Sequence, residues 1–468
     1  MDKKRGFLAF LFLCLLSTLP FISASTPVFA ASAENTWQTA EPLPEAVVGG
    51  RAGVVDGKIY VMDGYLNYQY DPASDTWTAK KPMPTPRILF GMAVWQDKIY
   101  VIGGGKGVDE SNQRWSILSD AVEVYDPSTD TWQTKQPMPT ARAYLEASVV
   151  NGQIYLVGGM NNKDKYVNLN EVYTVANDSW AMVEPIPYSV YSYASAVCGD
   201  KIYIIGGQSL QAPITNVNYV QIYDCSNNSW SFGTPMPTFV WLTAAGATTG
   251  EAAIRRIYVM GGVTSDDDVL GDVQVYDPQI DAWTLGASIP SVRNLHAVAV
   301  VDDRIYVIGG DPYCAPGANY DPIGNLVWYT HNEVYTPFGY GSPDPAYVLE
   351  HYPPGISVVS PLNQTYNETA VSLLFNVDKT VDWMGYSLDG QDNVTISGNT
   401  TITDLANGLH NVTVYARDAF DNTGASETII FNVEMPEPFP TTLVAAAYIA
   451  SAGIIAVGLL VYFKKRKH

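Results

Sequence analysis

The chain has 468 residues, of which 47% are hydrophobic and 16% are charged, so it is long enough for two to three domains and disorder is not expected. A formal net charge of −21 makes the chain repel nucleic acid and anionic lipid surfaces, which excludes both as expected partners. Four cysteines in a chain of this length cannot form a disulfide framework. Composition therefore indicates an acidic, well-folded protein.

Residues 1–33 have the layout of a secretory signal peptide. Basic residues at positions 3–5 precede an apolar run from Phe7 to Leu19, and small residues follow. We expect cleavage near Ala30 or Ala33. The alternative is an uncleaved anchor helix, for which the apolar run is shorter than the ~20 residues that a membrane span needs.

A repeated strand phrase dominates residues 34–338. Its clearest copy, Ile99–Gly104, is a run of β-branched and aromatic residues that ends in a glycine pair, which predicts a buried strand followed by a turn. The other copies begin at Ile59, Ile154, Ile202, Ile257 and Ile305. Only the first copy replaces the glycine pair, with Asp63-Gly64.

Each copy lies in a longer unit of four predicted strands. A strand of small and apolar residues precedes the phrase, a third strand ends in tyrosine, and a fourth carries tryptophan before a Pro-Met-Pro-like loop. The tyrosines are Tyr70, Tyr125, Tyr173, Tyr223, Tyr276 and Tyr335, and the tryptophans that follow are Trp77, Trp132, Trp180, Trp230 and Trp283. Four short strands recurring in this way are typical of propeller blades, because a lone four-stranded sheet buries both faces only by stacking with neighbours.

The glycine pair, the tyrosine and the tryptophan, each at its place in the unit, resemble the kelch repeat. This resemblance implies an all-β fold with a six-bladed kelch propeller over residues 34–338. Only five tryptophans follow a third strand, and the sixth is Trp37. We therefore expect the N-terminal strand around Trp37 to complete the last blade, which contains Ile305 and Tyr335.

The connections of antiparallel strands fall on two faces. The 1–2 and 3–4 turns share one face and are mostly short, whereas the 2–3 and 4–1 loops share the other and vary in length. Variable loops on a rigid scaffold usually carry binding, so we predict that a ligand binds at this second face. The candidate ligand-binding residues are Arg87, Arg142, Arg293, Trp241, Tyr191, Tyr193, His296 and Glu146.

These residue types suit two kinds of partner. Arginine forks suit carboxylates and aromatic faces suit sugar rings, so the partner is expected to be a glycan or a protein. The three arginines also have a structural alternative, in which they tie neighbouring blades together through backbone carbonyls or acids, as is common in kelch propellers.

No cofactor or metal is expected. The acidic loop with Asp266, Asp267, Asp268 and Asp272 is a weak Ca²⁺ candidate, and a solvated loop is the favoured interpretation. Copper-radical galactose oxidases are kelch-like propellers that need histidines and a cysteine cross-linked to tyrosine. The propeller histidines here are His296 and His331, and no matching constellation with cysteine is present, so we argue against copper oxidation.

One enzymatic alternative stays open. A sialic-acid mutarotase also has a kelch-like propeller, and such an activity needs only acids and arginines in the mouth. Arg142, Arg293 and Glu146 could supply them.

The remaining chain divides into four segments. Residues 339–353 read as a linker, and about seven short strands over residues 354–435 predict an Ig-like or fibronectin-like β-sandwich that resembles modules of prokaryotic surface proteins. Residues 436–442 form a Pro-rich spacer. Residues 443–463 hold no charge and are long enough for a transmembrane helix. By the positive-inside rule, we expect the basic tail 464–468 to lie in the cytoplasm.

Outside the signal and the tail, 19 Lys and Arg face 46 Asp and Glu, so the predicted ectodomain carries a formal charge of −27. This part of the chain also contains seven Asn-x-Ser/Thr sequons, which are candidate glycosylation sites. They are Asn177, Asn227, Asn363, Asn367, Asn393, Asn399 and Asn411.

The sequence therefore predicts a single-pass cell-membrane protein whose kelch propeller stands on a sandwich stalk and binds a glycan or protein through its 2–3 and 4–1 loops. Two alternatives remain, a sugar-acting enzyme of mutarotase or epimerase type and a structural surface-layer or adhesion component.

Overall fold

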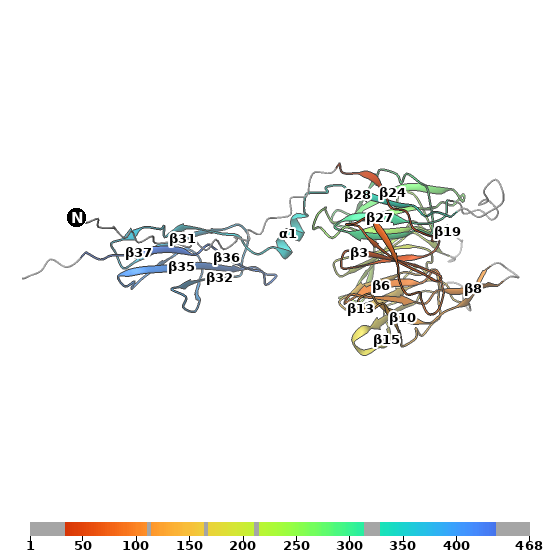
Figure 1. Ribbon diagram of the computed structural model, residues 1–468, viewed down its shortest axis with the longest axis horizontal. Helices are drawn as coiled ribbons and strands as arrows, with labels where there is room; N and C mark the ends of the chain where they lie inside the picture. The colour runs from red at the N-terminus through yellow and green to blue at the C-terminus, as the bar shows by residue number, and fades with distance from the viewer. Residues whose placement is uncertain (1–32, 110–113, 163–166, 210–214, 313–327, 437–468) are drawn as a thin grey trace, which may run out of the picture. The chain divides into compact units, whose positions relative to one another are not determined.

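The computed structural model describes residues 33–109, 114–162, 167–209, 215–312 and 328–436. These residues form two compact units, one that ends at Asp344 and one that begins at Pro345 (Figure 1). The regular secondary structure of both units is almost entirely β-strand, and each unit has its own buried hydrophobic residues.

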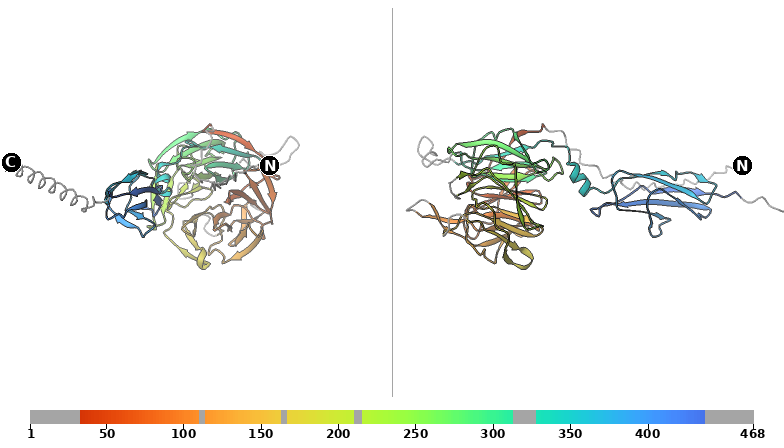
Figure 2. Two further views of the ribbon diagram at one scale, coloured as in Figure 1. Left: turned by 60° about the vertical axis from the view of Figure 1, so that its left-hand side comes forward. Right: turned by 180° about the vertical axis from the view of Figure 1, so that it is seen from behind.

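The described part of the first unit forms six four-stranded antiparallel sheets arranged around a common centre (Figure 2). Sheet 1 contains β2 (Arg51–Val55), β3 (Lys58–Asp63), β4 (Leu66–Asp71) and β5 (Thr76–Ala79). Sheet 2 contains β6 (Gly91–Trp95), β7 (Lys98–Ile102), β10 (Val122–Asp126) and β11 (Thr131–Lys135). Sheet 3 contains β12 (Ala147–Val150), β13 (Gln153–Val157), β14 (Asn170–Thr174) and β15 (Ser179–Met182).

The other three sheets repeat this pattern. Sheet 4 contains β16 (Ala194–Cys198), β17 (Lys201–Ile205), β20 (Val220–Asp224) and β21 (Ser229–Gly233). Sheet 5 contains β22 (Ala244–Ala247), β23 (Ile257–Val263), β24 (Val269–Asp277) and β25 (Ala282–Gly286). Sheet 6 contains β26 (Ala297–Val301), β27 (Arg304–Ile308), β28 (Asn332–Thr336) and β1 (Thr36–Ala40).

Two small hairpins and one short helix lie in the connections of this unit. The hairpins, β8 (Gly105–Asp109) with β9 (Arg114–Leu118) and β18 (Gln208–Ser209) with β19 (Thr215–Asn216), follow the second strands of sheets 2 and 4. A 3₁₀ turn, η1 (Val175–Asn177), follows the third strand of sheet 3.

Sheet 6 joins the two ends of the repeat region. Strand β1 pairs with β28, and Trp37 lies opposite Tyr335. This is the strand that the tryptophan count assigns to the last sheet. The chain that begins the first unit therefore completes its final sheet, about 300 residues later in the sequence.

A tyrosine, an Asp or Asn side chain and a backbone amide link each sheet to the one before it. In sheet 2, the Tyr125 hydroxyl donates to Asp130 Oδ1 (2.6 Å), and this oxygen also accepts the N–H of Lys81, which follows sheet 1 (2.9 Å). The Trp132 indole N–H donates to the Lys81 carbonyl (3.0 Å). The same three contacts recur in the other five sheets.

In sheet 6 the N-terminal segment supplies two of these groups. Asn35 Oδ1 takes the place of the aspartate and accepts from the Tyr335 hydroxyl and the Ala287 N–H, both at 2.6 Å. The Trp37 indole donates to the Ala287 carbonyl (2.8 Å). Closure therefore uses side chains as well as strand pairing.

Near the centre, six residues in the left-handed conformation form a closed ring of backbone hydrogen bonds, called here the inner ring. Its members, each just before a first strand, are Gly49, Leu89, Tyr144, Ser192, Leu242 and Leu295, with φ between 50° and 76°. Each N–H donates to the carbonyl of the preceding member, and Gly49 closes the ring on Leu295, with N···O distances of 2.8–3.1 Å. Five of the six are not glycine, so the backbone carries strain that the bonds and packing must offset.

The glycine pairs allow the neighbouring backbones to approach. Gly103 and Gly104 have φ of 69° and 101°, and the Gly104 N–H donates to the Arg142 carbonyl of the connection to sheet 3 (2.8 Å). A Cβ at Gly104 would lie 2.7 Å from the Ile88 carbonyl oxygen. Only glycine combines this conformation with this contact.

The core of the first unit is a chain of hydrophobic clusters, each shared by two neighbouring sheets. Between sheets 2 and 3, for example, Tyr100 and Ile102 pack with Ile154 and Leu156. Equivalent clusters join every other pair of neighbours, including sheets 6 and 1. Because the sheets bury their faces against each other, the unit depends on all of them.

The second unit contains two β-sheets around one core. Strands β29 (Ile356–Ser360), β31 (Val371–Val377) and β34 (Thr400–Ile402) form one sheet. The other contains β30 (Thr365–Tyr366), β32 (Trp383–Leu388), β33 (Val394–Ile396), β35 (Gly408–Arg417), β36 (Thr423–Ala425) and β37 (Ile429–Val433). Side chains of both sheets, such as Leu373, Val414 and Phe431, share this core. The Ig-like classification stays a prediction.

Part of the predicted linker is helical. Helix α1 (Pro345–His351) lies within residues 339–353, and its first residue is proline, which is favoured in the first turn of a helix. Within the residues that the structure describes, no helix is long and apolar enough to cross a membrane. The predicted span 443–463 and nearly all of the predicted signal 1–33 lie outside the described residues.

We expect the N-terminal strand to stabilise the whole first unit. A chain that begins at Glu41 loses β1, Asn35 and Trp37, and should unfold with a free energy at least about 3 kcal/mol below that of a chain that begins at Glu34, because a half-buried aromatic side chain and a paired strand are lost. Thermal and urea unfolding followed by circular dichroism measure the difference. Equal stability of the two chains would contradict the closure.

Candidate functional site

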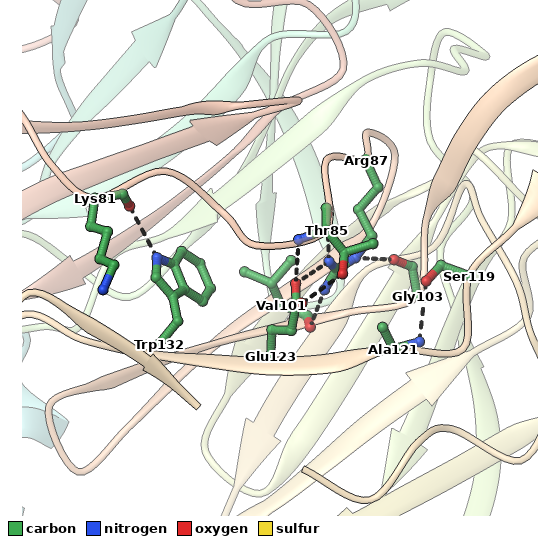
Figure 3. A network of polar contacts seen from close by, with 9 residues as sticks. All are labelled: Lys81, Thr85, Arg87, Val101, Gly103, Ser119, Ala121, Glu123 and Trp132. Atoms are coloured by element: carbon green, nitrogen blue, oxygen red, sulfur yellow. Dashed lines mark hydrogen bonds and ion pairs between the residues drawn. The ribbon is translucent and has the colours of Figure 1, made fainter. Parts of the chain in front are cut away.

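The three predicted ligand-binding arginines are buried. Arg87, Arg142 and Arg293 are at most 2% exposed. Arg87 Nε donates to the Gly103 carbonyl (2.7 Å) and Nη2 to the Val101 carbonyl (2.8 Å), and Nη1 pairs with Glu123 (Figure 3). Its hydrogen-bonding groups are therefore directed into sheet 2 and away from a ligand.

Each of the other two arginines makes the same kind of contact. Arg142 pairs with Glu171 (Nη2–Oε2 2.8 Å) and donates to the Gly158 carbonyl (2.6 Å). Arg293 pairs with Glu333 and donates to the Gly309 carbonyl (3.0 Å). The arginines thus fasten the connection between two sheets to the sheet that follows, which is the structural alternative, and their assignment to ligand binding is corrected.

In the sequence, each of these arginines is accompanied by a glutamate in the third strand of the sheet that follows. The position two residues before the third-strand tyrosine is Glu only where the connection carries Arg. In sheets 4 and 5 the connection carries Val190 and Val240, and the third strand carries glutamine. Gln221 and Gln274 bond through their amides to the backbone of the connection, at 2.8–3.1 Å. The sequence therefore pairs Arg with Glu and Val with Gln, and this pairing could have indicated a structural role for the arginines.

Trp241, another predicted residue, lies at the mouth of the ring of sheets. A cavity of about 290 Å³ opens there, on the side of the 2–3 and 4–1 loops. Its walls include Leu89, Leu242 and Leu295 of the inner ring, together with Ile88 and Trp241, and the polar residues Tyr144, Asn294 and Asp311 also line it. The site that remains at the mouth therefore combines apolar and polar groups.

The two predicted tyrosines have different environments. Tyr191 is half-buried, its hydroxyl bonds to Gln208, and its ring stands edge-on to the inner-ring Tyr144, with centroids 5.9 Å apart. Tyr193 is buried and its hydroxyl donates to the Val157 carbonyl. Tyr191 thus supports the wall of the mouth, whereas Tyr193 joins sheet 4 to sheet 3.

Glu146 and His296 line a second cavity of about 150 Å³, called here the axial cavity, among the first strands. Glu146 forms a two-point ion pair with Arg51 (2.7 and 3.0 Å), a residue that the sequence reasoning missed. Arg51 and Glu146 occupy equivalent positions in sheets 1 and 3, where the other sheets have Gly or Ala. Two oppositely charged residues at a position where the other sheets have Gly or Ala were the sequence signal that could have identified Arg51.

The buried groups of the axial cavity have shifted pKa values. Burial raises the pKa of Glu146, and Arg51 acts in the opposite direction. Burial, with the positive charges of Arg293 and Arg51, lowers the pKa of His296 to about 3. His296 is therefore neutral at physiological pH, and Glu146 is held beside its counter-charge.

The acidic loop does not gather into a metal site. Asp266, Asp267 and Asp268 are exposed in the turn between β23 and β24, where Thr264 bonds to the turn backbone. Among the described residues, no group of three His, Cys, Asp or Glu side chains could hold a metal ion. The Ca²⁺ candidate that also included Asp272 stays a prediction, and Cys314 lies outside the described residues.

Comparisons with known proteins bear on the repeat region. Residues 118–310 match a family model described as the KLHDC2/KLHL20/DRC7 Kelch-repeats domain, and residues 86–139 match the Kelch motif. A structure titled "Structure of YjhT" superposes with a TM-score of 0.52 at 17% identity, over 64% of this chain and 97% of that one. The chain therefore carries kelch repeats on a propeller-like all-β fold.

Curated relatives match the same region. Kelch repeat and BTB domain-containing protein 12 of Homo sapiens is 29% identical over 153 residues, which are 28% of this chain and 25% of that protein. Kelch-like protein 35 of Mus musculus is 28% identical over 300 residues, 63% of this chain and 39% of that protein. The chain thus spans a quarter to two fifths of the length of these relatives.

The Arg–Glu couple can be tested by converting one sheet to the other type. Arg142→Val alone leaves Glu171 buried without a counter-charge and should lower the free energy of unfolding by about 3–5 kcal/mol. Arg142→Val with Glu171→Gln reproduces the couple of sheet 4 and should recover most of this loss. Urea unfolding measures both variants, and a double variant as unstable as the single one would refute the structural role.

We expect His296 to make stability depend on pH. The folded chain binds fewer protons than the unfolded chain between pH 6.5 and about 3, so the free energy of unfolding falls as the pH falls through this window. From pH 6.5 to 4.5, wild type should lose about 2 kcal/mol more than His296→Gln, in which no imidazole titrates. The control is His351→Gln, at an exposed residue of the second unit, which should follow wild type. Parallel pH profiles of wild type and His296→Gln would contradict the prediction.

Proposed function

We propose that this chain is a kelch-repeat binding protein whose partner is another protein, docked at the mouth of a six-bladed propeller. The mouth cavity, of about 290 Å³, carries the proposal because it is large enough to receive a side chain of the partner. Its leucine, isoleucine and tryptophan side chains favour an aliphatic or aromatic side chain. Kelch repeats commonly bind protein partners, which supports the same class of function.

A second group of side chains supports docking on this side. Tyr188 and Phe232 are exposed by 39% and 51%, and together with Tyr219 they form an aromatic cluster with centroids 4.8–6.4 Å apart. Tyr188 precedes the first strand of sheet 4 and Tyr219 precedes its third strand, so both lie on connections of the mouth side. Exposed aromatic side chains are frequent anchors in protein interfaces.

The setting of this function is proposed from the terminal sequence patterns. A signal over residues 1–33 and a span over residues 443–463 would place the mouth outside the cell, on a stalk formed by the second unit. All seven sequon asparagines are exposed, as glycosylation requires. Asn177 and Asn227 lie in 3–4 turns, away from the mouth. The mutarotase alternative loses Arg142 and Arg293 and keeps Glu146.

The proposal predicts that Trp241→Ala weakens partner binding at least about tenfold, because a large aromatic wall of the mouth is removed. The matched control is Ile280→Ala, which removes an exposed apolar side chain from a 3–4 turn on the opposite side. Residues 34–435 of wild type and both variants are applied to an array of secreted and surface proteins and to a glycan array. Binding that Trp241→Ala leaves unchanged would refute the mouth as the site, and selective glycan binding would replace the protein partner.

A further inference from the structure

The mouth cavity has one acidic residue in its described wall. Asp311 lines the cavity, and neither lysine nor arginine is among the described residues that line it. Asp311 is half-buried, and its backbone bridges to Asn294, with N···O distances of 2.9 and 3.0 Å. This bridge fixes the residue to the connection before sheet 6. A carboxylate accepts several hydrogen bonds, so Asp311 can bond to an entering group in addition to its contacts within the chain.

The other polar groups of the cavity leave this negative charge in place. Asn294 Nδ2 donates to the Asp311 carbonyl (3.0 Å), and its amide carries no charge. Tyr144 also lines the cavity, and burial raises its pKa to about 12, so its hydroxyl is neutral at physiological pH. The described wall therefore combines a carboxylate with neutral groups, and it disfavours an acidic side chain of the partner.

The loops around the mouth have the same sign of charge. Among the exposed Asp, Glu, Lys and Arg side chains of the 2–3 loops that the structure describes, four are aspartates and one is a lysine. They are Asp120, Asp266, Asp267, Asp268 and Lys106. A surface of negative potential attracts a basic surface and speeds its association, so charge complementarity favours a basic segment of the partner at this side.

The apolar walls suit the stem of a long basic side chain. Leu89, Leu242 and Leu295 line the cavity together with Asp311, and Trp241 adds an aromatic ring. Lysine and arginine bury their methylene groups against apolar surface while their charged ends keep polar contacts. The face of a tryptophan ring also attracts a cation. One such side chain would use the leucines, the tryptophan and the carboxylate together, whereas a purely apolar side chain would cover the carboxylate without bonding to it.

We propose that the mouth cavity receives a lysine or arginine side chain from a basic segment of the partner protein. Its methylene groups pack against the leucines and its charged end bonds to Asp311. This inference rests on the proposed docking of a protein at the mouth, and it adds the chemistry of the anchoring side chain. Docking could also use an apolar anchor, so the two proposals can fail separately.

Three short peptides separate the charge of the anchor from its apolar character. Acetyl-Gly-Gly-Arg-Gly-Gly-amide is the probe, and the same peptide with leucine or glutamate at its centre is the comparison. Each peptide carries at most one charge, so the general attraction of polycations to an acidic protein is small. Saturation-transfer NMR with the full-length chain should give an affinity for the arginine peptide at least about fivefold above that for the leucine peptide, and the glutamate peptide should bind most weakly.

Two substitutions at one position test the role of the carboxylate. Asp311→Asn keeps the size of the side chain and removes its charge, so the affinity for the arginine peptide should fall at least about fivefold. Asp311→Lys should reverse the preference, so that the glutamate peptide binds more tightly than the arginine peptide. A residue that only supported the fold would not give this reversal. The control is Asp56→Asn, which removes an exposed carboxylate from a 1–2 turn on the opposite side and should behave as wild type.

Circular dichroism confirms that the variants are folded, and Asp311→Asn decides the test if Asp311→Lys is not. The cationic anchor is overturned if wild type does not prefer the arginine peptide, if the preference survives Asp311→Asn, or if no peptide binds up to about 10 mM. Equal binding of the arginine and leucine peptides that Trp241→Ala abolishes would overturn the cationic anchor and keep the mouth as a docking site. Docking itself is decided separately, by Trp241→Ala on the protein array.

Discussion

The inner ring of six backbone hydrogen bonds is the constraint on which the first unit depends. Each member donates its N–H to the member before it, and Gly49 closes the ring on Leu295. The bonds require a left-handed backbone at each position, which disfavours every residue except glycine. A six-membered circuit closes only when every sheet contributes one member, so this geometry couples the sheets beyond their hydrophobic contacts.

At the periphery of the first unit, side chains connect each sheet to its neighbour. A tyrosine, an Asp or Asn and a tryptophan connect each sheet to its predecessor, and Asn35 and Trp37 supply the last set. The N-terminal segment is therefore needed both for strand pairing and for these contacts. Two concentric sets of bonds, near the centre and at the periphery, hold the hydrophobic clusters between them.

Charged side chains inside the first unit occur in two different environments. The buried arginines at the connections each have a glutamate partner and backbone carbonyls, so these charged groups are buried beside a counter-charge. Arg51 and Glu146 instead face the axis, where small neighbours leave space around them. The first set fastens the connections to the sheets, and the second lines the axial cavity.

The repeating parts of the fold could be predicted from the sequence. The glycine pairs, the tyrosines, the tryptophans and the missing sixth tryptophan indicated the strands, their order and the role of Trp37, because each copy obeys the same local backbone and packing rules. The candidate residues were harder, since a side chain such as that of Arg142 can point to solvent or into the sheet, and its partner Glu171 lies on another strand.

These side-chain directions depend on the tertiary structure. It buried the three arginines, left Trp241 at the mouth, and brought Arg51 of sheet 1 to Glu146 of sheet 3 past the small residue of sheet 2. Contacts of this kind depend on where distant copies meet around a closed circuit. The repeat pattern indicates that the ring of sheets closes. The contacts of the residues that differ between copies depend on which side chains the closed ring places beside them.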